Sequence, residues 1–120
     1  MARYRLSDLA KADIAAILKI SEKRHGTQAR LRYRALLTAA MRRIAADPGE
    51  CSATDCSDLF AGVRSFHIRH SRDESREEPV RDPVHVIFYR VPQPDVVEIV
   101  RVLHERGAKP PSEWLSRSSR

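Results

Sequence analysis

Residues 84–91 read VHVIFYRV, and residues 96–104 read VVEIVRVLH. Both stretches are nearly continuous in β-branched, aliphatic and aromatic residues, which is typical of strands buried in a sheet. Residues 92–95, Pro-Gln-Pro-Asp, separate the two stretches and predict a turn. Upstream, residues 63–69 alternate between apolar and polar side chains, as a half-buried strand does. The second half of the chain therefore predicts a three-stranded antiparallel meander.

The first half of the chain has the period of helices instead. Ser7 is a candidate N-cap for a helix with Asp8 in its first turn, and Gly26 is the candidate end of that helix. Thr27 opens a second helix, which Asp47-Pro48-Gly49 ends. The second helix has the most regular apolar stripe in the chain, formed by Tyr33, Leu36, Leu37, Ala40, Met41 and Ile44. Two amphipathic helices joined at a glycine predict an antiparallel helical hairpin.

Together these patterns predict an α+β fold. Residues 3–6 form a short first strand, and the helical hairpin lies over one face of a sheet that the meander completes. We expect one domain over residues 1–106 and a loosely ordered tail over residues 107–120, held only around Trp114. Residues 71–83 hold one aliphatic side chain among 13 residues, so we expect an extended, mobile polar loop there.

The size and charge of the chain narrow its class. Its 120 residues make one domain, and its net charge is +6. No apolar run approaches the roughly 20 residues of a membrane span, and the opening MARYR does not begin a secretory signal, so we expect a cytoplasmic protein. Residues 1–48 hold 11 Lys or Arg and 4 Asp or Glu. This excess favours an acidic partner, either nucleic acid or an acidic protein segment, although arginines also simply solvate helix faces.

Few residues are arranged for catalysis. No Gly-rich phosphate loop, His-Glu-x-x-His motif or nucleophile elbow occurs. Cys51 and Cys56, in a predicted polar loop over residues 49–62, form no Cys-x-x-Cys pair, so we expect ordinary thiols, no metal and no cofactor. Basic and imidazole side chains do recur along the predicted strands, where they would surround an anion or pair singly with carboxylates. They are Arg64, His67, Arg69, Arg90, Arg101, His104 and Arg106.

Several segments resemble the ParE branch of the ParE/RelE toxin superfamily of bacterial toxin–antitoxin modules. The two most specific are HVIFYR at residues 85–90 and IVRVLHER at residues 99–106. The other matching pieces are Tyr4-Arg5-Leu6-Ser7, Ala12-Asp13-Ile14, Tyr33, Leu36, Asp47-Pro48 and Leu59 with Gly62-Val63-Arg64-Ser65-Phe66. The pieces occur in the order of the family, from residue 4 to about residue 106.

The resemblance implies the toxin half of a two-component module. ParE-type toxins act on DNA gyrase and are held inactive by a ParD-like antitoxin, whose flexible tail wraps the toxin. By this resemblance the strand residues Arg64 to Arg106 named above would contact the target. The antitoxin would contact the second helix at Arg30, Tyr33, Arg34, Leu37 and Arg42. The basic surface then suits an acidic tail, and we expect neither sequence-specific DNA binding nor a membrane partner.

Two other functions remain open at this point. RelE-like relatives are ribosome-dependent endonucleases that cleave mRNA with clustered basic residues and a C-terminal Tyr or His. Arg64, Arg90, Arg101 and His104 would form such a cluster, although no Lys lies on a predicted strand and no Tyr follows Tyr89. The remaining alternative is a protein that binds an antitoxin and has no toxicity.

Overall fold

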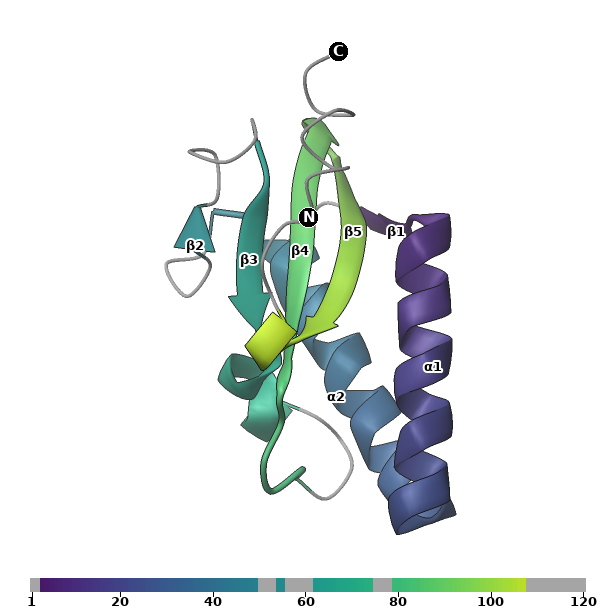
Figure 1. Ribbon diagram of the computed structural model, residues 1–120. Helices are drawn as coiled ribbons and strands as arrows, with labels where there is room; N and C mark the ends of the chain where they lie inside the picture. The colour runs from purple at the N-terminus through teal and green to yellow at the C-terminus, as the bar shows by residue number, and fades with distance from the viewer. Residues whose placement is uncertain (1–2, 50–53, 56–61, 75–78, 108–120) are drawn as a thin grey trace.

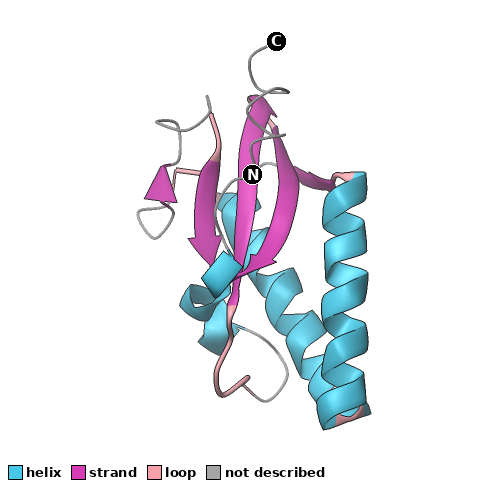
Figure 2. Cartoon of the chain, viewed as in Figure 1, coloured by secondary structure: helices cyan, strands magenta, loops and turns pink. Residues whose placement is uncertain are grey.

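A sheet and a pair of helices form the two layers of this computed structural model (Figures 1 and 2). The structure describes residues 3–49, 54–55, 62–74 and 79–107. The helices and strands are β1 (Arg3–Leu6), α1 (Asp8–His25), α2 (Thr27–Ala46), β2 (Thr54–Asp55), β3 (Arg64–His67), β4 (His85–Gln93) and β5 (Val96–His104). Two 3-10 helices, η1 (Ile68–Glu74) and η2 (Glu105–Gly107), follow β3 and β5.

The described strands form one sheet in the order β1-β5-β4-β3-β2. The pair β1–β5 is parallel and every other pair is antiparallel. In Figure 1, α2 crosses behind the sheet and α1 runs beside β5. The predicted α+β fold, with a strand, a helical hairpin and an antiparallel meander, is confirmed.

The predicted helix boundaries are also confirmed. The Ser7 hydroxyl accepts the Ala10 N–H at 3.0 Å as an N-cap, and it donates to the Val100 carbonyl of β5 at 2.7 Å. Gly26 separates the helices with φ of +92°, a conformation that costs glycine little because it has no Cβ. Ser7 thus both starts α1 and ties that start to the sheet.

The core lies between α2 and the sheet. Leu36, Leu37 and Ile44 of α2 pack in one cluster with Ile87 and Tyr89 of β4, and all five are at most 1% exposed. Tyr89 is therefore a core residue, and its buried hydroxyl donates to the Pro48 carbonyl at 2.6 Å. Burial of this many large side chains is what holds the hairpin on the sheet.

The turn between β4 and β5 is shorter than predicted. Residues 92–95 were expected to form it, but β4 continues to Gln93, which pairs with Val96, so only Pro94 and Asp95 turn. Pro92 lies in the strand where the β4–β5 register shifts between Arg90 and Gln93. An irregular position of this kind tolerates a residue without an N–H.

Two further predictions around β3 are wrong. The strand predicted over residues 63–69 ends at His67, because the chain turns into η1 at Ile68. The loop predicted over residues 49–62 contains β2, whose two residues pair antiparallel with Arg64 and Ser65. Neither alternation nor composition marks a strand of two residues, since its pairing comes entirely from the neighbouring strand.

The expectation of an unpacked loop over residues 71–83 is wrong for the described part of that segment. Ser71 is fully buried in η1, Pro83 is buried, and Val80 packs against the core cluster. Side-chain hydrogen bonds hold the segment: Arg72 Nε donates to the Val80 carbonyl at 2.6 Å, and Arg43 of α2 pairs with Glu74 at 3.0 Å. Composition missed this because side-chain hydrogen bonds and an ion pair hold the segment in addition to the packing of Val80 and Pro83.

Some predictions fall outside the described residues. They are the thiols of Cys51 and Cys56, and the tail from residue 108 with Trp114. Within the described ranges, no helix is long and apolar enough to cross a membrane. In those same ranges, no three His, Cys, Asp or Glu side chains gather in a way that would hold a metal ion.

Candidate functional site

The basic and imidazole side chains predicted along the strands do not form one cluster. Arg90 lies near the end of β4, opposite Glu98, whereas His85 begins β4 opposite His104. Arg90 lies five positions after His85 along β4, which is a distance of roughly 17 Å. The predicted set is therefore divided between the two ends of the sheet, with Arg101 between them.

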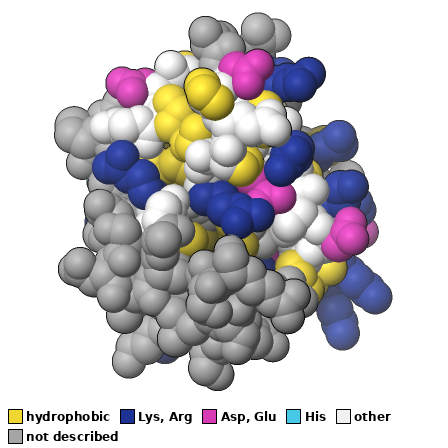
Figure 3. All heavy atoms as spheres, turned by 90° about the horizontal axis from the view of Figure 1, so that it is seen from above, with side chains coloured by type: hydrophobic (Ala, Val, Ile, Leu, Met, Phe, Trp, Pro, Cys, Tyr) yellow, Lys and Arg dark blue, Asp and Glu magenta, His cyan; other side chains and the backbone are white. Residues whose placement is uncertain are grey.

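At the turn end of the sheet, the arginines are engaged by acidic groups. Glu98 accepts from Arg90 Nε at 2.5 Å and pairs with Arg5 Nε at 3.5 Å. Arg64 lies opposite Tyr89, and its Nε is buried with no hydrogen-bond partner among the described residues. Seen from above, the basic side chains of this face are spread among acidic and hydrophobic ones (Figure 3). This end thus offers a partly neutralised surface.

Arg101 is a structural residue of the helix–sheet contact. Its Nε and Nη2 donate to the two Asp13 carboxylate oxygens at 2.8 and 2.9 Å, and one of those oxygens also accepts the Val102 N–H at 3.0 Å. The Asp13 and Arg101 side chains are only 13% and 17% exposed. β1 pairs with β5 only as far as Ile99. Beyond that point, Asp13 accepts the backbone N–H of β5 at Val102, where β1 no longer provides an acceptor. Sequence reasoning expected strand arginines to surround an anion or pair with carboxylates, and it did not find Asp13.

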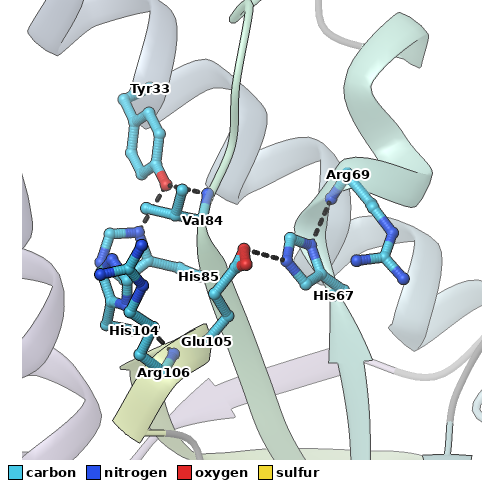
Figure 4. Close-up of polar contacts among 8 residues, drawn as sticks. All are labelled: Tyr33, His67, Arg69, Val84, His85, His104, Glu105 and Arg106. Carbon is cyan, nitrogen blue, oxygen red and sulfur yellow. Dashed lines mark hydrogen bonds and ion pairs between the residues drawn. The ribbon is translucent and has the colours of Figure 1, made fainter.

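The other end of the sheet holds an imidazole cluster, which comprises Tyr33, His67, His85, His104 and Glu105 (Figure 4). It lies where β3 and β5 end, where β4 begins, and beside the second turn of α2. The rings of His85 and His104 stand edge to face, with centroids 5.6 Å apart and planes at 77°. Strand register brings these two histidines together.

Backbone donors determine the tautomer of His67. The Arg69 N–H donates to His67 Nδ1 at 3.1 Å, so in the neutral ring the proton is on Nε2. This Nε2 lies 3.1 Å from Glu105 Oε1 and donates to it. That hydrogen bond, together with the charges of the nearby histidines and Arg69, lowers the pKa of Glu105. Both nitrogens of His67 are therefore occupied.

Tyr33 and His85 form the second hydrogen-bonded pair of the cluster. The Tyr33 oxygen accepts the Val84 N–H at 3.2 Å, and it shares a hydrogen bond with His85 Nδ1, 2.5 Å away. Burial raises the pKa of Tyr33 to about 12, with the charges of Glu105 and Asp82 adding to the rise. Burial and the neighbouring histidines lower the pKa of His85 to about 4. Both rings are therefore neutral at pH 7.

His104 is the exposed histidine of the cluster. The Arg106 N–H donates to its Nδ1 at 3.1 Å, which again leaves the proton of the neutral ring on Nε2. Of the predicted target residues, His67, Arg69, His104 and Arg106 thus lie together at this end. Sequence reasoning did not include His85, because only the pairing of β4 with β5 places it opposite His104.

The low pKa of His85 predicts that the protein loses stability as the pH falls. In the unfolded chain this histidine binds a proton near pH 6.5, and in the folded protein only near pH 4. Between these values the unfolded state binds more protons, so the free energy of unfolding decreases as pH falls, by at most about 3 kcal/mol from this group. Chemical denaturation from pH 7.5 to 4 measures the slope. His85→Asn should flatten it, His25→Asn should not, and equal slopes in all three proteins would contradict the assignment.

The residues predicted to contact an antitoxin are not all at the surface. Arg34 and Arg42 are exposed on α2, and Arg30 pairs with Glu22 across the hairpin at 3.2 Å. Tyr33 is 9% exposed and Leu37 is 1% exposed, because both face the sheet. The prediction that Tyr33 and Leu37 contact the antitoxin is therefore wrong. An apolar stripe in a helical sequence does not distinguish a face packed in the core from a face that binds a partner.

Comparison with known proteins agrees with this architecture. The family described as the ParE toxin of the type II toxin–antitoxin system parDE matches residues 4–108. The chain is also similar to Toxin ParE1 of Caulobacter vibrioides, with 36% identity over 105 residues, which is 88% of this chain and 91% of the relative. The match spans the hairpin and all the described strands, including the imidazole cluster. The chain belongs to the ParE toxin family of type II toxin–antitoxin systems.

Proposed function

We propose that this toxin inhibits DNA gyrase by binding to it, and that a ParD-like antitoxin neutralises it. Membership of the ParE family supports both parts, since the family is named for the toxin of parDE modules. The distribution of charge supports an acidic antitoxin segment, because 11 Lys or Arg face 4 Asp or Glu within residues 1–48.

The separation of the basic residues carries the preference for binding over RNA cleavage. A nuclease centre built from Arg64, Arg90, Arg101 and His104 needs those groups around one phosphate. Arg90 is hydrogen-bonded to Glu98, and Arg101 is hydrogen-bonded to Asp13. His104 is paired with His85, which lies about 17 Å along β4 from Arg90. This arrangement offers surfaces for a partner rather than a convergent set of catalytic groups.

A paired assay tests the target. Purified toxin is added to gyrase with relaxed plasmid and, in parallel, to translating ribosomes programmed with mRNA. We expect loss of supercoiling with intact mRNA. His104→Gln keeps a hydrogen-bonding side chain but cannot carry a proton at neutral pH, so it should leave gyrase inhibition within about twofold.

A nuclease would give the opposite pattern. It would cleave mRNA and leave gyrase unaffected, and His104→Gln would cost it roughly 10²–10⁴ in rate if His104 were its acid or base. That result would replace the proposal with the RNA-cleaving alternative. Inactivity in both assays would instead favour an antitoxin-binding protein without toxicity.

The antitoxin contact is expected on the exposed face of α2, at Arg34 and Arg42, with Arg30 at its edge. Arg34→Glu/Arg42→Glu should weaken the complex roughly 10- to 100-fold, mainly through slower association, because attraction of an acidic segment becomes repulsion. The remaining affinity should depend less on salt. Surface plasmon resonance against the antitoxin at several salt concentrations measures both. The control variant Arg3→Glu/Lys11→Glu makes the same change in net charge outside α2. An equal loss of antitoxin affinity in this control would contradict the placement of the antitoxin on α2.

A further inference from the structure

The closed end of the helical hairpin carries most of the net positive charge of the protein. We call residues 19–32, which are the end of α1, Gly26 and the start of α2, the hairpin tip. The hairpin tip holds 5 Lys or Arg and one acidic residue, whereas the rest of the chain holds 17 and 15. Its cations are Lys19, Lys23, Arg24, Arg30 and Arg32. Arg30 pairs with the acidic residue, Glu22, at 3.2 Å, and Arg32 is half-buried.

The hairpin tip extends beyond the sheet (Figure 1). After Asp13, which contacts β5 at Val102, α1 continues for about 18 Å, whereas β5 continues past Val102 for only about 7 Å. Lys19, Lys23 and Arg24 are exposed there, and their side chains make no ion pair or hydrogen bond within the described residues. These three cations are therefore available to an anionic partner.

We propose that the hairpin tip binds the phosphate backbone of duplex DNA without regard to base sequence, with Lys19, Lys23 and Arg24 as its main contacts. Exposed cations without carboxylate partners gain affinity for DNA because their binding releases counterions that are condensed on the duplex. Thr27 and Gln28 are exposed in the same segment, and they add a hydroxyl and an amide that can donate hydrogen bonds to phosphate oxygens. Contacts to the backbone position a protein on DNA and do not read its sequence.

Charge density and the few apolar side chains favour DNA over an acidic protein segment at the hairpin tip. Duplex DNA carries one negative charge per about 1.7 Å, whereas an extended acidic polypeptide carries at most one per about 3.3 Å. A protein segment also needs apolar anchors. Ile20 is the one large apolar side chain exposed on the described α1 part of the tip. Leu31 lies on the outer face of α2, three positions before Arg34, where the antitoxin is proposed to bind.

Binding of the full chain to a fluorescent duplex of about 20 base pairs tests the proposal. Fluorescence anisotropy measures the affinity between about 25 and 200 mM KCl, without gyrase or antitoxin. We expect a dissociation constant on the order of 10 µM at about 50 mM KCl. The logarithm of the association constant should fall with the logarithm of the salt concentration with a slope of about −3, because each of three neutralised phosphates contributes about −0.9. Two duplexes of unrelated sequence should bind within about twofold of each other.

Variants assign the DNA binding to the hairpin tip. Lys19→Gln/Lys23→Gln/Arg24→Gln keeps long, helix-forming side chains without their charge. It should weaken DNA binding roughly tenfold or more and bring the salt slope to between about −1 and 0. Each single neutralisation should reduce the slope by about 0.9. Lys19→Arg/Lys23→Arg/Arg24→Lys keeps the charge and should bind within about twofold of the unmodified protein. Unchanged circular dichroism establishes that each variant is folded.

The control variant removes equal charge elsewhere. Arg3→Gln/Lys11→Gln/Arg81→Gln neutralises exposed residues outside the hairpin tip and makes the same change in net charge. It should retain the salt slope of the unmodified protein and bind DNA within about threefold, because only the long-range attraction is reduced.

Competition distinguishes DNA from an acidic protein segment. Poly-glutamate of the same total charge should displace the labelled duplex at least about fivefold less effectively than unlabelled duplex does. Equal or better competition by poly-glutamate would assign the hairpin tip to an acidic protein and overturn the proposal. The proposal is also overturned by an unchanged salt slope in the folded glutamine triple variant, by an equal loss in the control variant, or by no binding at about 25 mM KCl up to about 200 µM protein.

Discussion

Replacing Asp13 with alanine is expected to destabilise the protein by about 3 kcal/mol, which lowers its melting temperature by about 12 °C. The Asp13 carboxylate accepts three hydrogen bonds, two from Arg101 and one from the Val102 N–H. Its removal leaves a guanidinium that is 17% exposed without this counter-charge, and a backbone donor of β5 without its acceptor. Denaturant unfolding of both proteins measures the difference.

Two comparisons separate the buried pair from ordinary surface charge. Glu22→Ala removes an exposed ion pair between Glu22 of α1 and Arg30 of α2, and should cost less than about 1 kcal/mol. Asp13→Ala/Arg101→Met should recover part of the loss, because the stranded charge goes with its partner. A cost for Asp13→Ala no larger than that of Glu22→Ala would show that the pair contributes nothing beyond a surface contact.

Deleting residues 71–83 is expected to destabilise the protein by about 3 kcal/mol or more, enough to leave a large unfolded fraction near 37 °C. A short Gly-containing turn in their place would lose the buried Ser71 and Pro83 and the packing of Val80. It would also remove the contact of Glu74 with Arg43 of α2. Circular dichroism during thermal unfolding measures the change.

The matched control keeps the segment and changes only its exposed charges. Asp73 and Arg81 are both exposed, so Asp73→Ala and Arg81→Ala should each change the free energy of unfolding by less than about 0.5 kcal/mol. A deletion variant that melts within a few degrees of the full chain would show that the segment adds nothing to the fold, as its composition alone suggests.

The candidate site was predicted less completely than the fold, for a reason visible at single residues. His67, Arg69, His104 and Arg106 were identified, because alternation places them at strand ends. Arg90 lies at the opposite end of the sheet, because it is paired with Glu98 near the β4–β5 turn. His85 was missed, since only the register of β4 against β5 brings it to His104.

Periodicity, caps and turn residues were sufficient for the element order. Ser7 caps the start of α1 and Gly26 ends it, and continuous apolar stretches indicate β4 and β5. The sequence predicts these elements because each signal depends only on residues that are close together in the chain. The roles of polar side chains were a matter of contacts between distant residues. Asp13 meets Arg101 across 88 positions and Tyr33 meets His85 across 52. Local sequence patterns do not predict such pairs, because they form only when the helical hairpin packs on the sheet. Burial in that packing then shifts the pKa values of Tyr33 and His85.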